Sequence, residues 1–269
     1  MVDHVKGLQF ARYADDTIIW SKDYTKISRA FEIITEFSFE AGIEINKEKS
    51  KGISLLCADS MPSEFANTKS QVEFLGYAIS VDNVSIKNAS VAKIKKQISY
   101  ILYKHLIQPL NKKPLRAIKI PANDKDEALL SAICEIRRYL YGNLNEEMIS
   151  AYLTGRSNHI FFKGIMSFYP IINDVNQLKE LDGWLVNAIF KSVQKRKKML
   201  DAHSLPRGHI YPFKATRKEF LMFCNTTKIG KKKLLKIPSF MTIYQAMKKG
   251  LVEIGIAGIT DPMADSYDY

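Results

Sequence analysis

Asp15 and Asp16 are adjacent acidic residues, and of all the residues in this chain they most clearly suggest a chemical role. They lie between two apolar, β-prone segments, residues 8–13 and 17–20, which predict a hairpin with a tight Asp-Asp corner. Like charges this close together are unfavourable unless a cation neutralises them. Magnesium prefers carboxylate, phosphate and water oxygens, and two such ions can clamp the oxygens of a phosphoryl transfer. An Asp-Asp turn alone is common, so the pair is informative only through its surroundings.

Residues 10–17 (FARYADDT) closely resemble the C motif of reverse transcriptases, particularly the bacterial group II intron, retron and defence-associated branches. This resemblance implies that Asp15 is the catalytic metal ligand and Asp16 a weaker second ligand or support. The implied cofactor is Mg²⁺, as two ions of which one or both are completed by residues outside this chain. Tyr13 and Ala14 would lie beneath the primer terminus and the incoming nucleotide.

Two further segments resemble motifs of the same family, in the family's order. Residues 42–50 (GIEINKEKS) are similar to its D motif, and Lys49 aligns with the lysine thought to assist the leaving pyrophosphate. A cation there would stabilise charge that develops on the leaving group, although alone it could be a solvated turn lysine. Residues 74–77 are similar to the E motif, which implies that the following residues grip the primer: Phe74, Leu75, Gly76 and Tyr77. Gly76 permits either a close backbone approach or a bulge.

The elements that must position these motifs predict an α+β fold, and the resemblance implies that residues 1–87 are part of a polymerase palm. The apolar residues Ile27, Phe31, Ile34 and Phe37 recur at helical spacing, and Gly42 provides a stop. Further strands are expected over residues 52–57, 72–80 and 84–86. We therefore expect an antiparallel sheet with a helix on one face.

A helical region is expected over residues 88–200, and the resemblance implies that it is the polymerase thumb. Helices are predicted over 89–106, 126–141 and 178–200, separated by Gly, Asn and Pro breakers. Residues 201–269 form a basic C-terminal extension that matches no family element.

Positive charge is concentrated in residues 185–250, which hold 16 Lys and Arg against Asp201 and Glu219, a net +14 in a chain of net +12. Such a block predicts binding to a polyanion. The resemblance implies that the partners are an RNA template and a DNA primer or product, with dNTP as substrate. A solvated lysine-rich surface is the plain alternative. The residues expected to contact phosphates are Lys195, Arg196, Lys197, Lys198, Lys231, Lys232 and Lys233. No stretch is apolar enough for a membrane span, and the three separated cysteines suggest a reduced, cytoplasmic setting.

The sequence departs from the family in one large respect. Only 14 residues precede Asp15, so the fingers and two palm motifs, one of which supplies another aspartate, are not expected here. A second polypeptide or a lost N-terminal segment would have to supply them. The chain could then be a fragment, half of a split enzyme, or a decayed relative. The alternative function is non-catalytic RNA binding by a maturase-like remnant.

Overall fold

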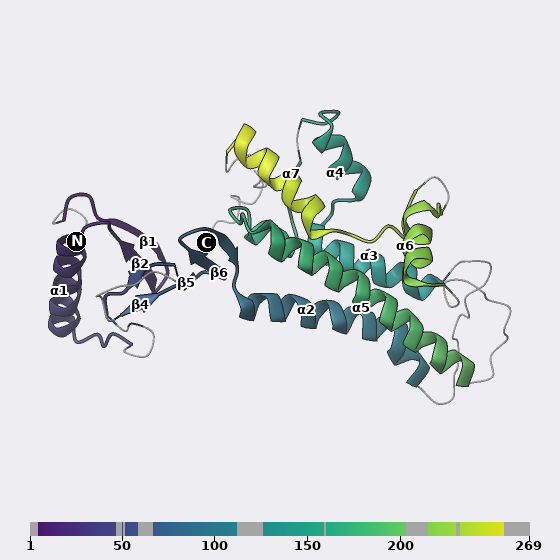
Figure 1. Cartoon of the computed structure of the whole chain (residues 1–269), viewed down its shortest axis with the longest axis horizontal. Coiled ribbons are helices and arrows are strands. Elements are labelled where there is room, and N and C mark those ends of the chain that lie inside the picture. The colour runs from purple at the N-terminus through teal and green to yellow at the C-terminus, as the bar shows by residue number, and fades with distance from the viewer. Residues whose placement is uncertain are drawn as a thin grey trace. The chain divides into compact units, whose positions relative to one another are not determined.

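The chain, described here by a computed structural model, forms two compact units, Met1–Val84 and Ser85–Tyr269 (Figure 1). The structure describes residues 5–46, 50, 52–58, 67–111, 126–158, 160–202, 215–229 and 232–255. Unit 1 combines short strands with one helix, and unit 2 is mainly helical. The chain is therefore α+β, as the sequence predicts.

Unit 1 begins with an antiparallel hairpin of β1 (Gln9–Tyr13) and β2 (Asp16–Trp20), followed by helix α1 (Tyr24–Ala41). Asp23 caps the start of α1, where its carboxylate accepts a hydrogen bond of 2.9 Å from the backbone N–H two residues later. Gly42 follows the last turn with a φ of 65°, a left-handed conformation that glycine adopts without steric cost. The predicted helix and its stop are confirmed.

The core between this hairpin and α1 is small. It consists of apolar residues before β1, on β2 and on one face of α1: Val5, Leu8, Ile19, Ile27, Ala30 and Ile33. Phe37 lies seven residues after Ala30, on the same face of the helix, yet its side chain is 62 % exposed. The described hairpin therefore leaves part of the apolar face of α1 uncovered.

The remaining strands are short, and the last of them begins at the final residue of unit 1. They are β3 (Leu55–Leu56), β4 (Thr68–Lys69), β5 (Gln71–Phe74), β6 (Tyr77–Ser80) and β7 (Val84–Ile86). β3 and β4 pair in parallel, and the other three form a sheet in the order β5-β6-β7. The strand predicted over residues 52–57 is thus limited to two residues.

Unit 2 is built from six α-helices in its described part. They are α2 (Asn88–Leu102), α3 (Glu127–Tyr141), α4 (Glu146–Leu153), α5 (Val175–Ala202), α6 (Arg217–Thr226) and α7 (Phe240–Glu253). α2 continues into a π-helical turn at Tyr103–Ile107 and a 3₁₀ turn at Gln108–Asn111, and a further 3₁₀ turn spans Ile165–Phe168. The three helices predicted in this region are confirmed as α2 with its π turn, α3 and α5.

Helix α5 is the centre of unit 2, where it packs against α2, α6 and α7 (Figure 1). Its buried residues recur every three or four positions: Leu178, Leu181, Leu185, Ile189, Val193, Arg196 and Leu200. Because α6 and α7 pack on it, the described residues beyond 201 belong to the same unit as the preceding helices. Among the described helices, none combines the length and apolar character needed to cross a bilayer.

Gln177, in the first turn of α5, holds the end of β7. Its side-chain amide accepts a hydrogen bond from Ile86 N–H and donates one to Ile86 O, both at 2.8 Å. These two bonds imitate the pairing of a neighbouring strand, and they fix the start of unit 2 onto α5.

Candidate functional site

The two acidic residues lie at the tip of the β1–β2 hairpin. Tyr13 pairs with Asp16, so Ala14 and Asp15 form a two-residue loop. Ala14 has a φ of 52°, and a positive value at this position matches the twist of the flanking strands. Arg12 Nε donates to Ala14 O at 2.9 Å, which braces the loop from its own strand. The predicted hairpin is confirmed, but its corner is formed by Ala14 and Asp15, and Asp16 is the first residue of β2.

Tyr13 and Asp16 lie on the face of the hairpin opposite α1. Ile19 packs into the core beneath α1, and side chains alternate between the two faces along a strand. Asp16 precedes Ile19 by three residues and Tyr13 is its cross-strand partner, so both point away from α1. Tyr13 is 66 % exposed, and Asp15 and Asp16 are exposed as well. The open face of the hairpin thus presents an aromatic ring next to the Asp16 carboxylate, with Asp15 exposed in the adjoining loop.

The carboxylates of Asp15 and Asp16 are oxygen donors of the kind that magnesium prefers. Within the described ranges, no group of three His, Cys, Asp or Glu side chains is arranged to hold a metal ion. The pair therefore fits an open magnesium site that takes its other oxygens from phosphate, water or a further acidic residue. It does not fit a closed site made only of ligands in the described part of the chain.

The second predicted site, residues 74–77, forms the turn of the β5–β6 hairpin. Phe74 pairs with Tyr77, and the two loop residues, Leu75 and Gly76, have φ values of 48° and 86°. Two positive φ values are the pattern of a type I′ turn, which glycine accepts freely and leucine accepts at a steric cost. Gly76 therefore permits a tight turn rather than a bulge. The described strands of the two hairpins belong to separate sheets.

Some predicted site residues lie outside the described residues. They are Lys49 and Lys231, whose roles stay predictions. Lys232 and Lys233 are described and exposed, in the segment before α7.

The basic run near the end of α5 divides between surface and core. Lys195 and Lys198 are exposed, and Lys197 is half-buried. Lys191 is exposed too, and its spacing of four and seven residues places it on the same helix face as Lys195 and Lys198. These three lysines, the lysine face of α5, are available to phosphates.

Arg196 corrects the prediction that the whole run contacts nucleic acid. Its side chain is only 2 % exposed, and its Nε lies 3.1 Å from Asp126 Oδ2 in a buried ion pair. Its Nη1 donates to Leu106 O at 3.1 Å, while the other oxygen of Asp126 caps α3. Three residues after Val193 and four before Leu200, Arg196 occupies a core position of α5, and this spacing could have identified it from the sequence.

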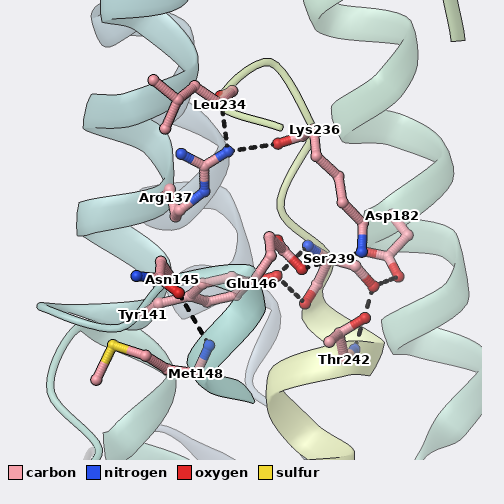
Figure 2. Close-up of polar contacts among 10 residues, drawn as sticks. All are labelled: Arg137, Tyr141, Asn145, Glu146, Met148, Asp182, Leu234, Lys236, Ser239 and Thr242. Atoms are coloured by element: carbon pink, nitrogen blue, oxygen red, sulfur yellow. Dashed lines mark hydrogen bonds and ion pairs between the residues drawn. The ribbon is translucent and has the colours of Figure 1, made fainter. Parts of the chain in front are cut away.

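A polar network that the sequence did not reveal joins α7 to α3 and α5 (Figure 2). Asp182 on α5 accepts hydrogen bonds from Ser239 Oγ at 2.7 Å and Phe240 N–H at 2.6 Å, at the start of α7. Tyr141 on α3 donates its hydroxyl to Ser239 O at 3.0 Å. Burial raises the pKa of the Asp182 carboxyl, and the hydrogen bonds from Ser239 and the α7 backbone oppose that rise.

The same network fixes the segment that leads into α7. Arg137 Nη2 donates to Leu234 O at 3.0 Å and Lys236 O at 2.6 Å, and Lys236 Nζ lies 3.4 Å from Glu146 Oε2 (Figure 2). The side chains of this network pair with backbone carbonyls before α7 and with backbone N–H groups at its start. Their role is therefore to stabilise the packing of α7.

His105 has a structural role. It contacts Glu135 on α3, and Lys104 Nζ lies 3.0 Å from the same carboxylate. Burial alone would raise the pKa of Glu135, but the hydrogen bonds from His105 and Lys104 hold it below its usual value.

Residues 1–79 match the family model described as "Reverse transcriptase (RNA-dependent DNA polymerase)". The match includes the Asp15–Asp16 hairpin, α1 and the turn at residues 74–77, and it does not extend into unit 2. No curated protein and no solved structure matches the chain. The match supports reverse transcriptase function in general and does not distinguish the branches of that family.

Proposed function

We propose that this chain carries the catalytic hairpin of a magnesium-dependent reverse transcriptase that copies an RNA template into DNA. The observation that carries the proposal is the exposed Asp15 and Asp16 pair at a hairpin tip, inside the stretch that matches the family model. The reaction would be attack of a primer 3′-hydroxyl on the α-phosphate of a deoxynucleoside triphosphate.

In this proposal, Asp15 and Asp16 hold Mg²⁺ on the open face of the hairpin. Bound magnesium supplies charge stabilisation at the transferring phosphate. Tyr13, exposed on the same face as Asp16, supports the primer terminus and the nucleotide together with Ala14. Lys49 donates to the leaving pyrophosphate.

The nucleic acid would be held by the second hairpin and by unit 2. The turn at residues 74–77 grips the primer strand, with Leu75 exposed at its tip. The lysine face of α5, together with Lys232 and Lys233, contacts phosphates of the template–primer. Contacts of this kind give affinity without sequence preference and weaken as salt increases.

A second polypeptide or further protein sequence would supply the fingers, the rest of the palm and another carboxylate. Three observations support this part of the proposal. The described residues offer no third metal ligand beside Asp15 and Asp16. The hairpin has two strands, which are marginally stable alone. Phe37 is exposed on the face of α1 that packs on the sheet, where additional strands would cover it.

RNA binding without catalysis, as in a maturase-like remnant, is a second candidate function. It is favoured by the contrast between the units, because unit 2 has a large core and an exposed lysine face that do not depend on unit 1. The resemblance to intron, retron and defence-associated enzymes suggests action in the bacterial cytoplasm for either candidate.

The test is incorporation of labelled dNTP on an RNA template–DNA primer with Mg²⁺, by the full chain with and without the polypeptide encoded next to it. We expect activity only in the combined preparation, and we expect Asp15→Asn to lower it by at least about a hundredfold, since metal-site charge stabilises the transition state. Asp82→Asn, at an exposed turn between β6 and β7, is the matched control and should leave activity unchanged. Activity that survives Asp15→Asn would contradict the proposed role. Template–primer binding without incorporation in the combined preparation would favour the second candidate.

A further inference from the structure

The outer side of α1 carries a surface that the proposed catalytic role does not use. Phe39 lies nine residues after the buried Ala30, which is two and a half helical turns, so it points away from the core. It is 90 % exposed, and Ile43, just beyond the end of the helix, is 60 % exposed. New strands added to the hairpin would cover Phe37 on the core side of α1, but they could not reach Phe39.

This apolar end of α1 has a fixed shape. Gly42 N–H donates to Phe39 O at 3.3 Å, and Ile43 N–H donates to Ser38 O at 3.0 Å. These bonds close the helix end and hold the chain at Ile43 relative to the last turn. Because the backbone is already held here, Phe39 and Ile43 lose little main-chain entropy on binding, which suits an anchor for a partner.

The charge around Phe39 is acidic. Residues 30–46 contain Glu32, Glu36, Glu40 and Glu44 and neither Lys nor Arg, in a chain whose net charge is +12. Glu32 and Glu36 precede Phe39 by seven and three residues, so they share its side of the helix. All of these glutamates are exposed.

The acidic charge indicates which kind of molecule could bind this surface. Glu32 is paired with Arg29 at 2.9 Å, but the carboxylates of Glu36, Glu40 and Glu44 would still repel phosphates of nucleic acid and anionic lipid headgroups. A protein surface that combines an apolar pocket with lysine or arginine at its rim is complementary in both respects. We propose that Phe39, Ile43 and the surrounding glutamates, the outer patch of α1, dock into such a basic-rimmed apolar pocket on a partner protein.

The test uses the full chain and two synthetic amphipathic helices with the same leucine face, one with lysine and one with glutamate as its polar residues. Fluorescence anisotropy at moderate salt measures their binding. The lysine peptide should bind, and Phe39→Ser should weaken it about tenfold, as expected for an exposed aromatic anchor. Glu36→Lys should weaken it as well and reduce its salt dependence. The glutamate peptide should not bind.

Phe168→Ser is the matched control, because Phe168 is also largely exposed, at 69 %, but lies in unit 2. It should leave binding unchanged, and circular dichroism should show the same helix content in Phe39→Ser as in the wild type.

Equal loss in Phe39→Ser and Phe168→Ser, or equal binding of both peptides, would overturn the proposal. Two further results would also overturn it: a dimer of the chain that dissociates in Phe39→Ser, which would make a second copy the occupant, or RNA binding that weakens in that variant. The proposal does not depend on polymerase activity, so these outcomes are separate from those of the incorporation assay.

Discussion

At the scale of single residues, neighbouring basic side chains in one helix do different things. Lys195 and Lys198 are exposed on α5, whereas Arg196 between them is buried in an ion pair with Asp126. The helical period alone decides this, since Arg196 shares the core face with the buried leucine, isoleucine and valine residues of α5. A run of positive charge in the sequence is therefore not a continuous phosphate-binding surface.

We predict that Arg196→Met lowers the free energy of unfolding by about 3–5 kcal/mol, because it leaves the Asp126 carboxylate buried without its partner. Lys195→Met and Lys198→Met should change stability by no more than about 0.5 kcal/mol, as exposed substitutions usually do. Urea unfolding followed by circular dichroism measures both effects. In filter binding to RNA, the two lysine variants should show a shallower salt dependence than the wild type. If Arg196→Met kept full stability and weakened RNA binding, the buried ion pair would not have the role that we assign to it.

At the scale of elements, turns and caps decide where the functional residues lie. The two-residue loops of both hairpins require positive φ, at Ala14 in the first and at Leu75 and Gly76 in the second. The site thus depends on backbone conformations that few residue types adopt freely.

A pair of glycine substitutions tests this dependence. Gly76→Ala should destabilise the β5–β6 hairpin by about 1 kcal/mol, because alanine is strained at a φ of 86°. Gly183→Ala should instead stabilise unit 2 by about 0.5–1 kcal/mol, since Gly183 lies within α5 and the added Cβ would enter open space. Hydrogen exchange of the hairpin amides and thermal unfolding of the full chain report the two changes. A neutral Gly76→Ala would mean that the turn is not held in this conformation.

Much of the local structure could be predicted from apolar periodicity and breaker residues. The β1–β2 hairpin, α1 with its stop at Gly42, and the three long helices of unit 2 all have clear patterns. The capping of α7 by Asp182 could not be predicted, because it joins residues 57 and 58 positions apart and depends on tertiary packing. The outer patch of α1 could not be predicted either. In the sequence, Phe39 is one of several apolar residues in a helix, and only the structure shows which face of that helix is buried.

At the scale of the whole molecule, the two units differ in how completely they bury their apolar residues. Unit 2 has a continuous core around α5, with polar bonds that fix α7. Unit 1 has a small core and exposes several aromatic side chains, among them Tyr13, Phe37 and Phe39. Exposed apolar surface is typical of interaction sites, so unit 1 is where we expect contacts with a partner, substrate and metal.

The measurement that tests the central claim most directly is iron-mediated cleavage of a bound template–primer. Iron(II) enters open oxygen sites in place of magnesium, and with ascorbate and peroxide it produces hydroxyl radicals that cut only nearby nucleic acid. The full chain, combined with the polypeptide encoded next to it, should cut the bound duplex next to the primer 3′ end. Asp15→Asn should abolish these cuts while binding persists, and Asp82→Asn should retain them. Cuts spread along the duplex, or cuts that persist unchanged in Asp15→Asn, would contradict a metal site at the hairpin tip.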